Sequence, residues 1–600
     1  MIATVVAVLA APGDEVAAGM PMMILEAMKM EHVVGAPTAG AVDAVRVALG
    51  ATVVEGEELA RIRPGTGAVD TAAAATNADL DTIRADLSEV FDRRATVLDA
   101  ARPEAVAKRH RLGRRTAREN VDDLCDPGTF LEYGALAVAA QRARRDHDDL
   151  VANTPADGLV AGIGHVNGEQ FADDASRCAV LSYDYMVLAG TQGYRNHHKK
   201  DRLFDLVERL RLPTVLFAEG GGGRPGDTDV PAISGNDVLA FTLFARLSGL
   251  VPLVGIGSGR CFAGNAALLG CCDVIIATTD ANIGMGGPAM IEGGGLGRVA
   301  PEEIGPVSVQ APNGVIDVLV HDDAEAVAAA KRYLSYFQGR LERWEATDQR
   351  AMRELVPENR KRVYDVRSVI ATLCDTGSVL ELRAAFGFGI VTALARIEGR
   401  PVGIVANNPT HLGGAIDADG ADKAARFMEC CDTFDLPLVF LADTPGFMVG
   451  PEAERSAQVR RFARMFTVGA NVTVPFCTVI LRKGYGLGAL AMAGGSFRAP
   501  LLTVAWPTGE VGGMGLEGAV QLGFRRELEA IEDSAEREAV YERMVAAAYE
   551  RSKALNAAEI LELDDVIDPA DTRARIAGLL RACRPPPPRA AKKRPNLHPW

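Results

Sequence analysis

The sequence predicts a multidomain protein in which a small all-β domain, a flattened β-barrel, precedes two tandem α/β domains. The β domain is predicted because apolar runs at residues 4–9 and 22–25 alternate with turn-forming residues. The tandem α/β domains are predicted because residues 212–219 are echoed by residues 436–443, 224 positions later. A chain of 600 residues that is 48% apolar also exceeds what one hydrophobic core requires.

The predicted β domain presents one lysine at a turn. Residues 26–31 read Glu-Ala-Met-Lys-Met-Glu, which places Lys29 between Met28 and Met30 directly after an apolar run. Turn-forming residues at 12–14 and 54–57 bound the neighbouring runs, so this lysine is expected at the tip of a hairpin on a compact β scaffold. The alternative is an ordinary surface lysine on an ordinary hairpin.

Composition divides the chain into five parts. We expect the β domain over residues 1–64, a linker low in bulky side chains over 65–78, and the first α/β domain, with a leading helical arm, over 79–350. The second α/β domain covers 351–583. The proline-rich, basic tail at 584–600 is expected to be solvated and disordered.

Further sequence markers indicate that the α/β domain is duplicated. They recur in the same order at nearly constant offsets: residues 188–190 and 412–414 at 224 positions, 251–252 and 474–475 at 223, and 277–287 and 505–515 at 228. Within each copy, continuous apolar runs that end in glycine-rich turns alternate with helical stretches. This alternation is typical of layered β/α units with buried strands.

In each copy a glycine-rich segment follows a predicted buried strand. The candidate catalytic residues are Gly221, Gly222 and Gly223 in the first copy and Gly486, Leu487, Gly488 and Ala489 in the second. Glycine lets the backbone approach a ligand and turn its N–H groups toward one oxygen, which makes an oxyanion hole without side chains. None of the nine histidines lies in a recognisable Ser/His/Asp or Cys/His setting. The alternative is that both segments are only tight turns.

Charge and cysteine usage exclude several function classes. A net charge of −15 and a pI near 5.3 argue against a nucleic-acid partner. No apolar stretch approaches the roughly 20 residues of a spanning helix, and the start does not read as a signal peptide, so we expect a cytoplasmic protein without a membrane segment. Ten cysteines without a C-x-x-C pair or a Cys/His array predict reduced thiols, no disulfides and no metal site.

The Met-Lys-Met run resembles the attachment hairpin of biotin carboxyl carrier domains, in which one lysine is joined to biotin by an amide bond. Lipoyl domains usually show Asp-Lys at this tip, so biotin is favoured over lipoate. The resemblance implies covalent biotin on Lys29, with Met28 and Met30 recognised by a biotin protein ligase. Met1 falls where such domains already have their first strand behind them. We therefore expect an exposed sheet edge along residues 4–9, unless a neighbour or the linker covers it; the alternative is that the true start lies upstream.

Residues 79–583 resemble the carboxyltransferase (beta) subunit of biotin-dependent acyl-CoA carboxylases, a pair of fused crotonase-like domains. The matching segments are residues 116–119, 182–190, 220–224, 396–407, 422–427, 443–447 and 505–508. The resemblance implies that the first copy binds acyl-CoA and the second binds biotin, in a hexamer whose active sites lie between the first domain of one subunit and the second domain of another. A separate biotin carboxylase subunit, which uses ATP, Mg²⁺ and bicarbonate, would complete the ligase.

The implied reaction moves a carboxyl group from N1′-carboxybiotin onto the carbon of an acyl-CoA thioester through an enolate. Negative charge then develops on the thioester oxygen and on the ureido oxygen of biotin, so two oxyanion holes are expected. The freed biotin nitrogen can accept the α-proton, so no protein base is required. The rival functions are the reverse transfer in a decarboxylase with a membrane partner, and a non-catalytic biotin-binding scaffold.

Two departures from the family pattern leave details open. Residues 220–227 lack the usual Ser-Gly-Gly-Ala-Arg-Ile-Gln-Glu, so the acyl group is not predicted, and residues 486–489 align in two ways with the family's Gly-Gly-Ala. A basic cluster formed by Arg195, His198, Lys199 and Lys200 is a candidate for binding the CoA phosphates. Its alternative is a solvated helix start.

Overall fold

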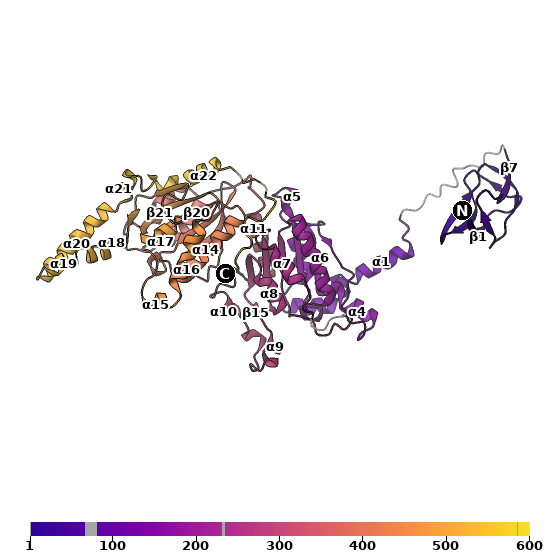
Figure 1. Cartoon of the computed structure of the whole chain (residues 1–600), viewed down its shortest axis with the longest axis horizontal. Helices are drawn as coiled ribbons and strands as arrows, with labels where there is room; N and C mark the ends of the chain where they lie inside the picture. The colour runs from indigo at the N-terminus through magenta and orange to yellow at the C-terminus, as the bar shows by residue number, and fades with distance from the viewer. Residues whose placement is uncertain (1, 66–80, 231–234, 585, 588) are drawn as a thin grey trace. The chain divides into compact units, whose positions relative to one another are not determined.

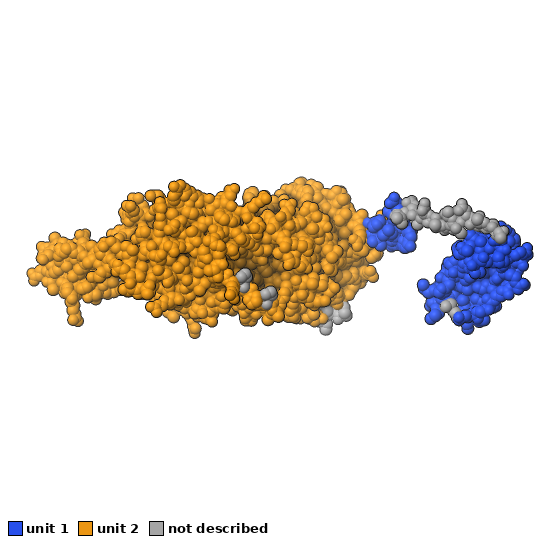
Figure 2. Space-filling model, turned by 90° about the horizontal axis from the view of Figure 1, so that it is seen from above, with its two compact units in different colours: residues 1–91 blue, residues 92–600 orange. Residues whose placement is uncertain are grey.

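The protein was analysed as a computed structural model, which describes residues 2–65, 81–230, 235–584, 586–587 and 589–600. The chain divides into two compact units, Met1–Phe91 and Asp92–Trp600, shown in blue and orange in Figure 2. The predicted linker at 65–78 lies almost entirely outside the described residues.

The first unit contains the predicted small β domain, built from a sheet of order β4-β3-β1-β6 and a sheet of order β2-β5-β7. The strands are β1 Ile2–Val8, β2 Glu15–Val16, β3 Pro21–Ala27, β4 Met30–Gly35, β5 Gly40–Val45, β6 Thr52–Val54 and β7 Ala60–Pro64. Inward-facing side chains such as Val5, Val16 and Met22 form its small core. The helix α1 (Ala85–Ala95) begins in this unit and ends in the second.

The exposed edge expected along residues 4–9 is wrong at Thr4 and Val5. β1 pairs with β3 on one side and with β6 on the other, where Ile2 lies opposite Val54 and Thr4 opposite Thr52. Val5 N–H continues this second side by donating to the Ala51 carbonyl at 2.8 Å. The second side of β1 is therefore covered from Ile2 to Val5, because a short strand late in the domain occupies this part of the edge.

The second unit contains the two predicted α/β copies, each built around one sheet (Figure 1). The first sheet, in the order β16-β14-β12-β11-β10-β9-β8, comprises β8 Leu131–Glu132, β9 Leu159–His165, β10 Arg177–Tyr183, β11 Thr214–Phe217, β12 Leu253–Gly257, β14 Val274–Thr278 and β16 Val318–Val320. The second, in the order β17-β18-β19-β20-β21-β22-β24, comprises β17 Leu380–Leu382, β18 Ile390–Ile397, β19 Arg400–Asn407, β20 Leu438–Thr444, β21 Phe476–Tyr485, β22 Leu502–Ala505 and β24 Asp565–Val566.

The pairing pattern confirms the duplication. In each copy an antiparallel hairpin, β9–β10 or β18–β19, is followed by parallel strands, β11 and β12 or β20 and β21. These central strands are buried, as their continuous apolar runs predicted. The boundary expected at 350/351 falls in the short helix η6 (Gln349–Ala351), between the two sheets.

Helices cover the sheets and project from them. The helices of the first copy are α2 Pro103–Arg111, α3 Ala117–Leu124, α4 His147–Asn153, α5 Asp173–Ser176, α6 Tyr194–Leu210, α7 Ala240–Leu247, α8 Gly264–Gly270, α9 Pro288–Gly293, α10 Val307–Gln310 and α11 Asp323–Ser335. Those of the second copy are α12 Met352–Leu355, α13 Val366–Leu373, α14 Ala418–Thr433, α15 Pro451–Glu454, α16 Gln458–Gly469, α17 Gly486–Ala491, α18 Leu516–Gly523, α19 Arg525–Glu529, α20 Ser534–Arg551, α21 Ala554–Glu559 and α22 Thr572–Ala582. The helices α6 and α14 begin 224 residues apart, and α18, α19 and α20 form a projection from the second copy (Figure 1).

The tail is not the disordered end that its composition predicted. Leu597 is buried, and Lys593 and Arg594 both pair with the buried carboxylate of Asp432 in α14. Lys592 donates to the Ser248 carbonyl of the first copy at 2.8 Å. The described part of the tail therefore bridges the two copies, because its cations meet carboxylates and carbonyls that the fold brings together.

All ten cysteines are free thiols, and most are buried. Among the residues that the structure describes, no His, Cys, Asp and Glu side chains gather in a group that could hold a metal ion. Within the same residues, every helix is too short or too polar to cross a membrane.

Candidate functional site

Lys29 lies at the tip of a two-residue hairpin between β3 and β4, where Ala27 pairs with Met30. Met28 and Lys29 both have positive φ angles, 52° and 64°, the conformation of a type I′ turn. Such angles are unfavourable for residues with a Cβ, so the surrounding β ladder must hold them in place. Both side chains are exposed, and Met28 is 95% accessible. The Lys29 amine is thus available to a modifying enzyme and can carry biotin.

The first glycine loop follows β11 and packs its backbone against a turn earlier in the chain. A Cβ on Gly220 would lie 2.3 Å from the Gly190 carbonyl oxygen, and a Cβ on Gly190 would lie 2.6 Å from the Glu219 oxygen. Both residues also have positive φ angles. Only glycine permits this close approach, which explains why the turn at residues 188–190 and the loop carry glycines together.

The loop lies between Gln192 and the N-terminus of α8. Gln192 N–H donates to the Gly222 carbonyl at 2.9 Å, and Arg224 N–H donates to the Gln192 carbonyl at 3.0 Å. Gly223 lies between these two bonds. On the opposite side, a Cβ on Gly222 would lie 2.7 Å from Ala263 Cβ and 3.4 Å from Gly264 N. The loop and the first residue of α8 are therefore in direct contact.

The second copy repeats this arrangement at an offset of 224 residues. Ile416 N–H donates to the Gly446 carbonyl at 3.0 Å, and Met448 N–H donates to the Ile416 carbonyl at 2.9 Å, so Phe447 occupies the place of Gly223. A Cβ on Gly488 would lie 2.7 Å from Gly446 Cα. Gly488 in α17 therefore corresponds to Gly264 in α8.

Each copy thus packs its loop against the first turn of a helix. Among the described residues, the N–H groups of Gly223, Gly264, Phe447 and Gly488 donate to no other backbone group. Two such donors converging on one oxygen can stabilise an oxyanion. Of the predicted candidates, Gly223 belongs to the first pair and Gly488 to the second, while Gly222 accepts from Gln192 N–H and Gly221 lies at the beginning of the loop.

Sequence reasoning missed Gly264, Gly446 and Phe447. The signal was present, because adding 224 to Gly222 and Gly264 gives Gly446 and Gly488. The same offset favours one of the two alignments left open for residues 486–489. Gly486, which has a φ of 58°, begins α17, and Leu487 takes the place of Ala263.

A buried carboxylate ends the strand before each loop, and the two carboxylates are also 224 residues apart. Glu219 accepts from Arg109 at 2.8 Å, and Asp443 accepts from Arg482 at 3.1 Å and from Tyr364 at 2.9 Å. Burial lowers the pKa of Arg109, but Glu219 outweighs burial and the net shift of this pKa is upward. Burial also raises the pKa of Tyr364, which therefore stays a neutral donor. These pairs fix the strand ends from which the loops start.

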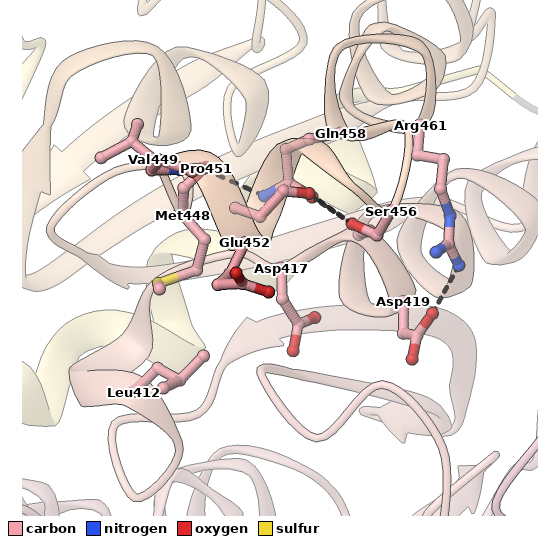
Figure 3. Close-up of a pocket in the computed structure, with 13 residues that line it drawn as sticks. Leu412, Asp417, Asp419, Met448, Val449, Pro451, Glu452, Ser456, Gln458 and Arg461 are labelled. Carbon is pink, nitrogen blue, oxygen red and sulfur yellow. Dashed lines mark hydrogen bonds and ion pairs between the residues drawn. The ribbon is translucent and has the colours of Figure 1, made fainter.

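Two hollows border the loop of the second copy. One, of about 370 Å³, is lined by Gly484, Gly486, Leu487 and Leu490 together with β23 (Glu510–Gly512). The other, of about 470 Å³, begins at Met448, the residue after Phe447, as Figure 3 shows. It is lined by Leu412, Asp417, Ala418, Asp419, Met448, Val449, Gly450, Pro451, Glu452, Ala453, Ser456, Gln458 and Arg461.

The side chains around the second hollow hold the loop in place. Gln458 donates to the Met448 carbonyl at 3.0 Å, and Arg461 forms an ion pair with Asp419 (Figure 3). The first copy differs at the position of Met448, because Arg224 there forms a buried ion pair with Asp157. The two loops therefore share their backbone path but not their side-chain supports.

The predicted CoA-phosphate cluster does not exist as a surface patch. Lys199 and Lys200 lie on the buried face of α6, where Lys199 donates to the carbonyls of Ala156 and Leu159 and Lys200 donates to the Tyr183 hydroxyl at 2.9 Å. Burial lowers the pKa of Lys199 to about 8 and that of Lys200 to about 7. Neither ammonium group can reach a bound phosphate, because helical periodicity turns both toward the core.

The remaining members of that cluster point elsewhere. Arg195 donates to the Val138 carbonyl at 3.1 Å, and only the His198 side chain is exposed, with its ring 4.5 Å from that of Tyr194. The structure therefore does not bring Arg195, His198, Lys199 and Lys200 together. The alternative of a solvated helix start is also wrong for the two lysines.

Comparison with known proteins identifies both units. The carboxyl transferase domain family matches residues 108–597, and the biotin-requiring enzyme family matches residues 1–62. The methylmalonyl-CoA carboxyltransferase 12S subunit of Propionibacterium freudenreichii subsp. shermanii is 34% identical over 83% of this chain and 94% of its own. The biotin-dependent long chain acyl-coenzyme A carboxylase beta4 subunit of Mycobacterium tuberculosis is 33% identical over 82% of this chain and 93% of its own.

Solved structures agree with these matches. A single-chain, multi-domain long-chain acyl-CoA carboxylase is 59% identical, with a TM-score of 0.80, over 96% of this chain. The match covers 55% of that longer chain. The transcarboxylase 12S hexamer with bound methylmalonyl-CoA is 32% identical, with a TM-score of 0.73, over 86% of this chain and 98% of its own.

Proposed function

The chain belongs to the carboxyl transferase family as a biotin-dependent acyl-CoA carboxyltransferase fused to a biotin carrier domain, and we propose that it carboxylates long-chain acyl-CoA. The 59% identity to a long-chain acyl-CoA carboxylase supports this choice of substrate. We further propose a hexamer, as in the transcarboxylase 12S structure, and a separate biotin carboxylase subunit as the source of the activated carboxyl group. Acyl-CoA, ATP and a biotin ligase are all used in the cytoplasm, which is the proposed location.

The observation that carries the proposed mechanism is the duplicated pair of free N–H groups. In the first copy, Gly223 and Gly264 would bind the thioester oxygen and stabilise the negative charge that grows when the α-proton leaves. In the second copy, Phe447 and Gly488 would bind the ureido oxygen of the carrier group. Each donor is a backbone group held by its strand and helix, so little reorganisation is needed when charge develops.

Lys29 has the separate role of attachment. Biotin, when bound there, supplies a nitrogen that carries the carboxyl group between two active sites. The exposed Lys29 amine, on a strained turn that only a rigid hairpin can hold, fits this amide-linked group. The carrier unit then provides a high local concentration of its cargo near the transferase sites.

A Lys29→Arg variant tests this division of roles. It keeps the charge but cannot form the amide, so intact mass should show no biotin adduct after coexpression with a biotin ligase, and ATP-dependent carboxylation should be lost. The variant should still decarboxylate a carboxylated acyl-CoA when free biotin is added, although slowly, because the tether no longer supplies biotin. Lys108→Arg, at an exposed lysine of α2, is the matched control and should behave like the wild type.

Two results would contradict the proposal. One is a wild type without biotin after coexpression with the ligase. The other is a folded Lys29→Arg variant that has lost the free-biotin reaction. A panel of acyl-CoA substrates from two to sixteen carbons, assayed with a biotin carboxylase, tests the substrate separately, because a preference for short chains would overturn only the long-chain assignment.

A further inference from the structure

Gln192 contacts both donor residues of the first site. Its backbone brackets Gly223, since its N–H donates to Gly222 and its carbonyl accepts from Arg224. Its side chain lies against Gly264, where an added Cβ would be 3.1 Å from three atoms of the Gln192 amide. The buried residue Gln192 therefore contacts both Gly223 and Gly264.

Asn265 holds the Gln192 side chain in this position. Gln192 Nε2 donates to Asn265 Oδ1 at 2.8 Å, and Asn265 Nδ2 donates to the carbonyls of Gly190 and Glu219, both at 3.2 Å. Asn265 is fully buried, and Gln192 is 3% exposed. This amide pair links the first turn of α8 to the residues from which the glycine loop starts.

The second copy shows that the fold does not require an amide pair here. The equivalent residues, 224 positions later, are Ile416 and Ala489, which are buried and apolar. Ile416 nevertheless makes the same two backbone hydrogen bonds as Gln192. The amide pair is thus an addition to the first site and does not belong to the shared architecture.

The first site also has a strained element that needs support. Ala263, the residue before Gly264, has φ 52° and ψ −122°, an unfavourable conformation for a residue with a Cβ. Its N–H donates to the Gly284 carbonyl at 3.1 Å. In the second copy the positive φ falls on Gly486, where glycine tolerates it. Extra hydrogen bonds around α8 are therefore expected in the first copy alone.

We propose that Gln192 and Asn265 are positioning residues that fix the separation and direction of the Gly223 and Gly264 N–H groups at the acyl-CoA site. The inference rests on the proposed function, in which these groups stabilise the thioester oxyanion. Donors act only within about 2.7–3.1 Å of the developing charge, and a displacement of about 1 Å can cost roughly 100-fold in rate. The amide pair acts through the donors and does not itself touch the reacting atoms.

The test compares Gln192→Met, Asn265→Ala and the double variant with the wild type, using palmitoyl-CoA, a biotin carboxylase and the full chain. Methionine keeps the length of Gln192 without its donor, and alanine is the residue of the second copy. We expect kcat to fall about 10- to 100-fold while KM for acyl-CoA changes less than about 3-fold. Because the two amides act as one unit, the double variant should be no worse than the poorer single variant.

Asn313→Ala is the matched control, since it removes an exposed Asn–Gln hydrogen bond of 2.9 Å on the same copy and should keep wild-type kcat. Thermal unfolding and palmitoyl-CoA binding report the folded fraction of each variant. If Gln192→Met is folded and keeps wild-type kcat, or if its loss of rate equals its loss of folded protein, the inference is wrong. An inactive wild type would instead contradict the proposed function.

Discussion

Removal of residues 592–600 should destabilise the second unit, although their composition resembles that of a disordered tail. The deletion takes away Lys593 and Arg594, which lie 2.9 and 2.7 Å from the Asp432 carboxylate. It also takes away Leu597, which is 4% exposed. The Thr473 N–H, which donates to Asp432 at 2.7 Å, remains. Asp432 would then lose both of its cationic partners.

The magnitude follows from these contacts. Removing the partners of a buried charge typically costs about 3–5 kcal/mol, and exposing one leucine costs about 1.5–3 kcal/mol. The two losses overlap, because they concern one segment, so we expect a total on the order of 5 kcal/mol. The midpoint of thermal unfolding should fall by roughly 5 °C.

Scanning calorimetry of the full chain and the deletion variant measures this loss, and pH adds a second readout. Burial raises the pKa of Asp432, but the Thr473 N–H, Lys593 and Arg594 outweigh burial and hold it below the usual value of 3.8. The carboxylate therefore contributes stability above pH 3.8 that is lost as the pH falls through its lower folded pKa. The difference between the two proteins should shrink in that acidic range.

Arg350→Ala, which removes an exposed pair with Asp348, is the control and should leave the midpoint unchanged. Equal unfolding temperatures for the wild type and the deletion variant at neutral pH would refute the reasoning. Such a result would mean that the contacts of the tail add no net stability to the second unit.

Two further predictions concern the first glycine loop and a buried lysine. A Cβ on Gly223 meets nothing within 4 Å, so Gly223→Ala should keep the fold and lose about 100-fold in turnover. Gly222→Ala or Gly222→Val must displace Ala263 and should also lower the unfolding temperature. Normal turnover of Gly223→Ala would show that this loop is not part of the site. Burial lowers the pKa of Lys423 from 10.5 to about 7, so the unfolded chain binds more protons between these values and stability should rise with pH across that window. In Lys423→Met this rise should be smaller, as measured by denaturant unfolding at pH 7 and pH 10. An unchanged rise in the free energy of unfolding between these pH values would contradict the lowered pKa of Lys423.

Local patterns predicted the architecture because burial and turn chemistry are local. Apolar runs gave the central strands, and glycines after these runs gave both loops, including Gly222 and Gly488. The hairpin of Lys29 followed from two short runs and the residues between them. The turn conformation itself was not predictable, because Met28 and Lys29 lack the glycine or asparagine that usually marks a type I′ turn.

The failures share one physical cause, which is that a partner far along the chain decided the outcome. Lys199 belongs to a basic run in the sequence, but helical phase and the carbonyls of Ala156 and Leu159 place it in the core. The tail meets Asp432, 162 residues before Arg594, so its composition alone could not reveal its docking. The first part of the edge expected along β1 was closed by β6, about 50 residues later.

The duplication explains how one fold can provide two similar but unequal sites. Both copies place a loop N–H and a helix N–H together through the same backbone bonds, Gln192 to Gly222 and Ile416 to Gly446. Geometry that depends on the backbone is therefore shared, since it is set by strand pairing and by glycines at equivalent positions.

The supports around the two sites differ in chemistry. The first site is tied by hydrogen-bonded amides and by the buried pair of Arg224 with Asp157, whereas Ile416 and Met448 take the places of Gln192 and Arg224 in the second. Buried polar networks that are satisfied hold a single geometry, while apolar contacts tolerate small shifts. In the proposed function, the supports of the first site would hold the thioester while it loses a proton. The second site has polar supports of its own, in which Gln458 donates to the Met448 carbonyl and Arg461 pairs with Asp419.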